Sequence, residues 1–442
     1  MSSQPRPDRR TFLSGAGASL AAIKLGQAGR GDEPKITHGP FRGDRGGVQF
    51  DVWARASTAG EYVLHVFDPG AEHGFHLYET AHATSDNDLT LHWTIAGLQI
   101  GGSAVSYVVQ IEQSGRKLWS ADDWYPCGHD WQASDRSLVI GSCADDHKFP
   151  EQLVWKRVRD CKPGAVVLIG DTPYIDSTDL EVQRRRYREF FAQPQMAEAL
   201  RAVPFYATWD DHDYAGNDLF GDAKGREQSR QAFLEYHPPG EYGENGQGIY
   251  SKFRRGSTEV FLLDTRWFAD IEPSPFDAAK KSLLGAAQWA WLQKCLTEST
   301  ATFKLLVCGM VWNGAVRGGK KDCWGNWPHE REGLFAWIGA KKISGVVLIG
   351  GDVHRTRALR HPTKAVAGYD IVELITSPLA NTILETNKID DPALLFDSGV
   401  EQSFLRLTPM HQDGDLLKAE FVDGEGKVFY ELPLHSRTLR AN

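Results

Sequence analysis

The 442-residue sequence has few cysteines, more acidic than basic residues, and no long hydrophobic run in its body. Its six cysteines, with no Cys-x-x-Cys spacing among them, are too few for a disulfide scaffold of this size. The formal net charge of −9 disfavours a nucleic-acid-coating role, because phosphate-backbone binding depends on clustered Lys and Arg. Beyond the N-terminal region we expect no transmembrane segment. The hydrophobic fraction of 41% and the charged fraction of 24% are typical of a soluble globular protein, and the length predicts more than one domain.

The N-terminal residues have the pattern of an export signal. Paired arginines at Arg9 and Arg10 are followed by Phe12-Leu13 and then by a weakly apolar stretch rich in Gly and Ala. This order resembles a twin-arginine signal, which exports folded protein. The alternative is a disordered basic tail, and Lys24 inside the apolar stretch would suit it. We therefore expect residues 1–35 to be a signal and linker. Export by the twin-arginine machinery would place the protein in the periplasm or outside the cell.

The next segment, residues 36–118, alternates apolar and polar side chains. Apolar residues occupy every second position at Leu89, Leu91, Trp93 and Ile95. Such period-two runs, separated by Gly- and Pro-containing turns, predict a small all-β sandwich module of the immunoglobulin type. Three histidines in its loop region could suggest a metal site, but they lack regularly spaced Cys or carboxylate partners, so we interpret them as surface residues: His73, His76 and His82.

After a Trp-rich connector (119–136), residues 137–442 alternate strand and helix patterns. The runs Val166–Ile169 and Val346–Ile349 are continuously apolar, as in strands buried on both faces. We expect one long helical region from about 178 to 202, a polar loop from about 216 to 248, and antiparallel edge strands in the tail. This alternation predicts an α/β fold with mixed or parallel sheets covered by helices.

Acidic and histidine side chains follow several of these strands. Gly170-Asp171, Asp210-Asp211-His212-Asp213 and Asp352-Val353-His354 each come directly after a buried strand. Singly, such residues are often turns or helix caps. Together they predict a metal site, because buried carboxylates are costly without a cation and Asp and His are common metal ligands. Cys143 ends another strand and Tyr174 lies three residues beyond Asp171; both could equally be inert packing residues.

The series of motifs resembles the alkaline phosphatase D family of secreted metallophosphoesterases. The motifs are Ser142-Cys143, Gly170-Asp171-x-x-Tyr174, Trp209-Asp210-Asp211-His212-Asp213, Asp264-Thr265-Arg266 and Gly351-Asp352-Val353-His354. Many members read Gly-Asp-Tyr-Ile-Tyr-Glu where this chain reads Gly-Asp-Thr-Pro-Tyr-Ile-Asp. Asp176 is therefore a candidate to replace that acid, one place along.

The resemblance implies a four-layer α/β/β/α sandwich in residues 137–442 and a centre of Fe³⁺ and Ca²⁺, although other divalent metals stay open. Carried over motif by motif, the implied metal ligands are Cys143, Asp171, Tyr174, Asp211, Asp352 and His354. The implied catalytic residues are His212, near the leaving group, and Arg266, as a phosphate contact. Asp210, Asp213 and Asn217 are candidates for supporting or calcium-binding roles.

The function that follows is hydrolysis of a small phosphate ester by a metal-activated hydroxide. Monoester and diester substrates both stay open, and a phospholipase-type diesterase of the same fold is one alternative. The alternative from another class is a non-catalytic surface protein that binds a ligand through its β-module and retains metal only for stability.

Overall fold

The structure, a computed structural model, describes residues 33–46, 49–67, 76–96, 106–126, 136–238, 240–316, 319–411 and 415–441. The expected twin-arginine signal and His73 lie outside these ranges. Among the helices described, none combines the length and apolar character needed to cross a membrane.

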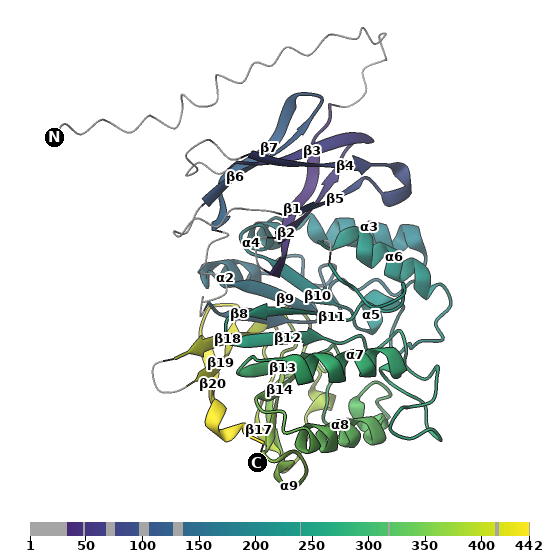
Figure 1. Ribbon diagram of the computed structural model, residues 1–442, viewed down its shortest axis with the longest axis vertical. Coiled ribbons are helices and arrows are strands. Elements are labelled where there is room, and N and C mark those ends of the chain that lie inside the picture. Colours follow the sequence, from purple (N-terminus) through teal and green to yellow (C-terminus); the bar gives the residue numbers. More distant parts are fainter. Residues whose placement is uncertain are drawn as a thin grey trace, which may run out of the picture. The chain divides into compact units, whose positions relative to one another are not determined.

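The N-terminal strands form two small antiparallel sheets (Figure 1). One sheet has the order β1 (Ile36–Gly46), β2 (Gln49–Ala56), β5 (Thr90–Ile95). The other has the order β4 (His76–Ala83), β3 (Gly60–Phe67), β6 (Ser106–Gln113), β7 (Arg116–Pro126). Their inward residues, among them Tyr62 and Trp93, pack into one apolar cluster, which agrees with the period-two pattern. His76 and His82 are exposed, as expected, but they lie in strand β4 and not in a loop. Strand β7 extends into the segment that we interpreted as a connector.

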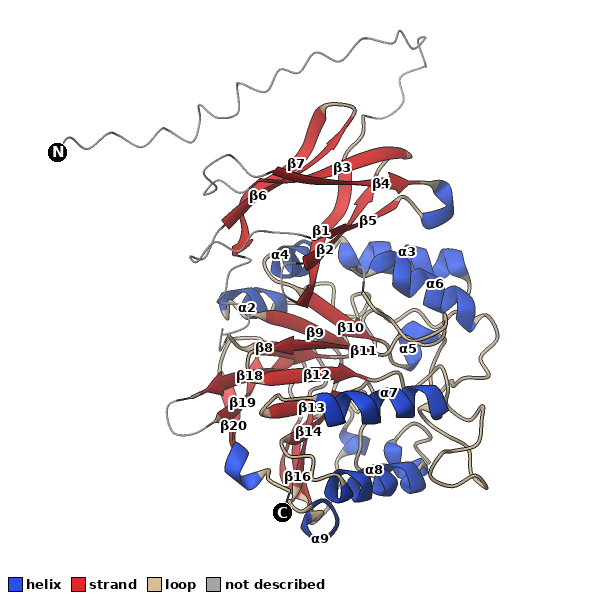
Figure 2. Cartoon of the chain, viewed as in Figure 1, coloured by secondary structure: helices blue, strands red, loops and turns tan. Residues whose placement is uncertain are grey.

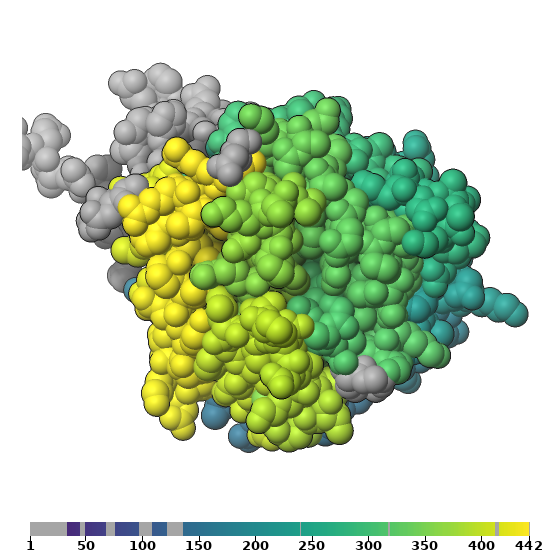
Figure 3. Space-filling model, turned by 90° about the horizontal axis from the view of Figure 1, so that it is seen from below, coloured from purple at the N-terminus to yellow at the C-terminus, as the bar shows by residue number. Residues whose placement is uncertain are grey.

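A six-stranded sheet carries the first of the long apolar strands. Its order is β10 (Phe205–Thr208), β9 (Ala165–Ile169), β8 (Leu138–Gly141), β18 (Ser403–Met410), β19 (Leu416–Asp423), β20 (Val428–His435). Strands β8, β9 and β10 are parallel, whereas β18 to β20 add in antiparallel fashion, as the tail pattern predicted. In Figure 3 these C-terminal strands (yellow) lie beside the segment around residues 370–400 (yellow-green) on one face.

A seven-stranded sheet carries the second long apolar strand. Its order is β11 (Ser251–Arg255), β12 (Thr258–Leu262), β13 (Phe303–Val307), β14 (Val346–Gly350), β16 (Ile371–Ile375), β15 (Thr356–His361), β17 (Leu394–Ser398). Strands β12, β13, β14 and β16 are parallel to one another, so their carboxyl ends meet at one edge.

Helices cover the outer faces of both sheets (Figure 2). They are α2 (Val154–Asp160), α3 (Leu180–Phe191), α4 (Pro194–Arg201), α5 (Asp211–Tyr214), α6 (Arg226–Tyr236), α7 (Gly285–Glu298), α8 (Pro328–Ala340) and α9 (Lys364–Ala367). Alternate residues of β9 separate the layers: Val166 and Leu168 pack with α2, α3 and α4, whereas Val167 and Ile169 pack toward the seven-stranded sheet. The predicted α/β/β/α sandwich is confirmed.

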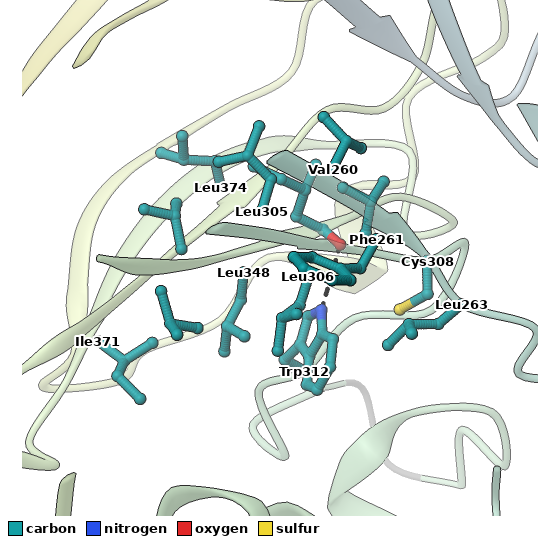
Figure 4. Close-up of a cluster of buried hydrophobic side chains, with 14 of the residues drawn as sticks. Val260, Phe261, Leu263, Leu305, Leu306, Cys308, Trp312, Leu348, Ile371 and Leu374 are labelled. Atoms are coloured by element: carbon teal, nitrogen blue, oxygen red, sulfur yellow. Dashed lines mark hydrogen bonds between the residues drawn. The ribbon is translucent and has the colours of Figure 1, made fainter. Parts of the chain in front are cut away.

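The core of the seven-stranded sheet is drawn in Figure 4, where Leu305, Leu306 and Leu348 come from adjacent parallel strands. Trp312, which follows β13, is fully buried beneath them and donates from Nε1 to the carbonyl oxygen of Ile349 at 3.1 Å. This bond fixes the start of the loop that runs from Trp312 toward α8.

Two local expectations were wrong. The helical region expected over 178–202 is two helices, because Pro194 begins α4 and cannot continue the hydrogen bonding of α3. The segment 216–248, expected to be a polar loop, contains the 11-residue helix α6. Its buried residues Ser229, Phe233 and Tyr236 are spaced three and four apart, a helical stripe that the many polar residues around it conceal.

The β-module is attached to the α/β/β/α sandwich through α3 and α6. The indole nitrogen of Trp53 donates to the carbonyl oxygen of Glu235 at 2.7 Å, and Asp88 pairs with Arg55 at 3.1 Å and with Arg188. Beside these contacts lies His237, which stacks on Phe233 with ring centroids 4.0 Å apart. Its Nδ1–H donates to the carbonyl oxygen of Phe233 at 2.8 Å, and burial of the ring favours the neutral imidazole.

Acid should therefore weaken this attachment. Burial lowers the pKa of His237 to about 4, from 6.5, and the nearby charge of His92 adds to this shift. The unfolded chain binds the proton more readily, so stability is complete above pH 6.5 and is lost as the pH falls toward 4. At pH 5 the expected loss from His237 is about 2 kcal/mol. Chemical denaturation of wild type and His237→Phe at pH 7.5 and 5.0 measures this loss of unfolding free energy. Between the two pH values, His237→Phe should lose less unfolding free energy than wild type. The exposed-histidine control His82→Phe should lose as much as wild type. Equal drops in all three proteins would contradict the prediction.

Candidate metal centre

Three strand ends bring the predicted ligands to one edge of the sandwich. Cys143 follows β8, Asp171 follows β9, and Asp352 follows β14. These three residues and His354 all adopt left-handed backbone conformations, with φ values of 60°, 54°, 66° and 51°. Such values are uncommon for residues other than glycine and concentrate at functional sites.

Glycines at the crossing points allow the strand ends to meet. A Cβ atom on Gly170 would lie 2.3 Å from Cβ of Asp210, and one on Gly351 would lie 2.4 Å from Oγ of Ser142. Any other residue would therefore push the strand ends apart. The close approach expected from the glycine before Asp171 is what the structure shows.

The first group of ligand-type side chains contains Cys143, Asp171 and His354, whose donor atoms lie within 4.8 Å of one another. Sγ of Cys143 is 3.5 Å from Oδ2 of Asp171. Oη of Tyr174 is 2.9 Å from Nε2 of His354, so the tyrosine belongs to the same group. A thiol, a carboxylate, a phenol and an imidazole thus converge from three loops.

Surrounding polar groups orient this set. Nδ1–H of His354 donates to the carbonyl oxygen of Thr382 at 2.8 Å, which leaves Nε2 with its lone pair directed toward Tyr174. Fixing the tautomer through the outer nitrogen is the usual arrangement for a metal-binding histidine. Ser377 accepts from the backbone nitrogen of His354 at 3.0 Å and lies 3.2 Å from Sγ of Cys143.

The second group shares Asp171 and adds Asp211 and His212 from the start of α5. Nδ1 of His212 is 2.6 Å from Oδ1 of Asp176, so this acid lies beside the predicted catalytic histidine. Burial lowers the pKa of His212, but the charge of Asp171 and the hydrogen bond to Asp176 outweigh it and raise the pKa to about 10. The His212 side chain is 21% exposed, so a substrate can reach it.

A third group contains Asp211, Asp218 and Asp322. Sequence reasoning did not select Asp218 or Asp322. The signal that could have found Asp322 is its place beside two lysines in a segment flanked by buried tryptophans, Trp312 and Trp324.

Arg266 is fully buried beside these acids. Its Nε donates to Oδ1 of Asp210 at 2.8 Å and its Nη2 to Oδ2 of Asp322 at 3.0 Å. This burial favours a role in holding the two carboxylates, in preference to the direct phosphate contact that the resemblance implied.

Asp213 caps α5, because its Oδ1 accepts from the backbone nitrogen of Asp210 at 2.6 Å. Asn217, the remaining candidate for a supporting role, is exposed.

Lys320 enters the centre from the loop before α8. Its Nζ lies 2.7 Å from Oδ1 of Asp322 and 2.6 Å from Oδ2 of Asp352. Its side chain is buried between these two acids.

The donor set fits a bound cation. Burial raises the pKa of the Cys143 thiol, and the charge of Asp171 raises it further. Burial also raises the pKa of Asp171 well above its usual range and that of Asp352 to about 7. Among the described residues, the buried oxygen Oδ2 of Asp210 has no hydrogen-bond partner. Acids packed this closely are stable in ionised form when a cation lies among them.

Comparison with solved structures identifies the class. The chain superposes on a structure of PhoD with a TM-score of 0.71 and 19% identity, covering 92% of this chain and 90% of that one. It superposes on purple acid phosphatase PPD1 from yellow lupin with a TM-score of 0.65 and 14% identity, covering 90% of this chain and 74% of that one. At these identities the likeness establishes the fold, which is that of a metallophosphoesterase.

The family follows from the sequence comparison. Residues 138–413 match the model of the PhoD-like phosphatases, and the chain belongs to that family. It is also 28% identical over 209 residues to alkaline phosphatase D of Bacillus subtilis strain 168. That alignment covers 40% of this chain and 36% of the relative. The resemblance read from the motifs is confirmed. Membership places the chain among hydrolases of phosphoric ester bonds and implies bound metal ions, for which the three groups above are the candidates.

Proposed function

We propose that this protein hydrolyses phosphate esters at a centre that holds Fe³⁺ and Ca²⁺. The observation that carries the proposal is the convergence of Cys143, Asp171, Tyr174 and His354 beside a second group that shares Asp171. A thiolate and a phenolate suit a trivalent iron, whereas a site of carboxylates alone suits calcium.

The ligands divide between two positions. Cys143, Tyr174 and His354 would hold the iron; Asp211 and Asp352 would hold the second cation; Asp171 would contact both. When bound, such ions lower the pKa of coordinated water and neutralise charge on the phosphoryl oxygens. Arg266 would keep the remaining carboxylates of Asp210 and Asp322 in place through its ion pairs, and Lys320 would orient the proposed ligand Asp352.

His212 would carry the proton for the leaving group. Its Nδ1–H donates to Asp176, which keeps the ring protonated and directs Nε2 away from that carboxylate. A proton delivered from Nε2 to the departing oxygen avoids a free alkoxide. We further propose export through the twin-arginine machinery, which the paired Arg9 and Arg10 support.

Metal removal tests this function. The protein, produced in a twin-arginine-competent host, is assayed with p-nitrophenyl phosphate and bis(p-nitrophenyl) phosphate before and after dialysis against a chelator. Turnover of at least one ester should fall by about a hundredfold or more and return when the metals found by elemental analysis are restored. Full metal content with no turnover on either ester, or on a wider panel that includes phospholipids, would favour the non-catalytic alternative.

A further inference from the structure

A cavity of about 810 Å³ adjoins the metal centre. It lies between the loop that precedes α7, the loop that precedes α8, and the first residues of α8. The lining residues that matter here are Phe220, Lys280, Lys281, Lys320, Lys321 and Trp327.

Two residues connect this cavity to the metal centre. Lys320 lines it and also reaches Asp352, a candidate metal ligand, with Nζ 2.6 Å from Oδ2. Phe220 also lies between them, with its ring 5.6 Å from the guanidinium carbon of Arg266 and 5.4 Å from the ring of Trp327. Lys320 and Phe220 thus form the border between the metal centre and the cavity.

The lining carries an excess of positive charge. Four lysines line the cavity against the single carboxylate of Asp270, which accepts from the indole nitrogen of Trp327 at 3.1 Å. This excess is local, because the whole chain has a formal net charge of −9.

Among the residues that the structure describes, two of the four ammonium groups have no acidic partner. Lys320 pairs with Asp322 and Asp352, and Lys280 lies 3.2 Å from Asp277. Nζ of Lys281 donates to the carbonyl oxygen of Ile271 at 2.9 Å, which leaves its charge uncompensated. Within the described ranges, Lys321 has no ion pair.

The first turn of α8 adds to this field. The helix begins at Pro328, in the cavity wall, and its N-terminal end carries the positive pole of the helix dipole. A neutral or apolar substituent would have to displace water from two unpaired ammonium groups without replacing its interactions. An anionic substituent is attracted both by these ammonium groups and by the positive pole of the helix.

From this we infer the substrate class, an inference that rests on the proposed function. We propose that the cavity binds a second phosphate group, carried by the substrate beyond the ester that is cleaved. Lys281 and Lys321 would contact this group, and Lys320 would mark the border between it and the metal centre.

Two matched diesters test the proposal: thymidine 5′-(p-nitrophenyl phosphate), and the same compound with a 3′-phosphate. They share the scissile bond and the leaving group. Wild type should show a kcat/KM about five- to tenfold higher for the compound with the 3′-phosphate, mainly through a lower KM. The double variant Lys281→Gln/Lys321→Gln should bring this ratio close to one. Because the interaction is ionic, the wild-type ratio should also fall as salt rises.

The control double variant Lys294→Gln/Lys341→Gln removes two exposed lysines elsewhere and should keep the wild-type ratio. Equal kcat/KM values in wild type, or a ratio unchanged by Lys281→Gln/Lys321→Gln, would overturn the subsite while leaving the hydrolase intact. If the metal-loaded protein cleaves neither diester, calorimetric binding of thymidine 5′-phosphate and thymidine 3′,5′-bisphosphate decides the subsite, whereas the proposed function fails only if p-nitrophenyl phosphate and the wider ester panel are not cleaved either. Equal affinities would overturn it; tighter binding of the bisphosphate, lost in the double variant, would support it.

Discussion

Replacing Asp171 by asparagine is expected to lower kcat/KM for phosphate esters by about a thousandfold and to reduce the content of bound metal. Asp171 belongs both to the group with Cys143 and His354 and to the group with Asp211 and His212. The loss of one shared negative ligand weakens both cation positions, and each cation supplies several kcal/mol of charge stabilisation in the transition state.

The substitution should leave the fold intact. Asp171 has a φ of 54°, and asparagine is among the residues that adopt this conformation most readily. Asparagine also keeps one of the two oxygens and nearly the same volume. Elemental analysis, kcat/KM and a thermal melt of the variant provide the test, with Asp423→Asn at the end of β19 as the control. An Asp171→Asn protein with full metal content and activity within tenfold of wild type would remove Asp171 from the shared position.

The positions of Cys143, Asp171 and Asp352 could be predicted from the sequence because each directly follows a buried strand. In parallel sheets the carboxyl ends of strands lie at one edge, so residues distant in sequence become neighbours without any knowledge of the loops. The glycines before Asp171 and Asp352 strengthened this prediction, since they occur where two backbones approach closely. The alternation of strands and helices predicted only an α/β fold with covered sheets; the four-layer arrangement came from the resemblance to the family.

Lys320 and Asp322 could not be placed in this way. They belong to the loop between Trp312 and α8, and a loop has no periodicity that fixes the direction of its side chains. What brings Lys320 to Asp352 is the burial of Trp312 and Trp324, which stack with ring centroids 4.0 Å apart and hold the loop against the sheet. That packing is tertiary and leaves no local pattern.

The roles of Asp210, Asp213 and Arg266 also depended on tertiary contacts. By residue pattern alone Asp210, Asp211, His212 and Asp213 are equivalent candidates for a metal site, and it was the resemblance that singled out Asp211 and His212. The structure turns Asp213 back to cap α5 and pairs Asp210 with the buried Arg266. Only Asp211 and His212 remain directed toward Asp171. A helix of four residues decides which of four adjacent polar groups face the centre.

Replacing His212 by glutamine is expected to lower turnover in a way that depends on the leaving group. A general acid contributes about 10²- to 10⁴-fold when the departing oxygen is a strong base, as in glycerol phosphate. It contributes much less for p-nitrophenyl phosphate, because p-nitrophenolate leaves without a proton. The turnover of the alkyl ester by His212→Gln should therefore be about 10²-fold or more below that of wild type. For the aryl ester the loss of turnover should be several-fold smaller. The exposed pair of His411 and Asp415, 3.0 Å apart, supplies the control variant His411→Gln.

Asp176 separates the acid role from metal binding. Its carboxylate is 54% exposed and lies 2.6 Å from Nδ1 of His212, and it belongs to none of the three ligand groups among the described residues. Asp176→Asn should lower turnover of the alkyl ester by about tenfold, with the same dependence on the leaving group and an unchanged metal content. An equal loss on both esters would show that His212 acts by charge or by ligation instead of proton transfer. A loss of metal in His212→Gln but not in Asp176→Asn would assign the imidazole to the cation, because only the histidine shares its group with Asp171 and Asp211.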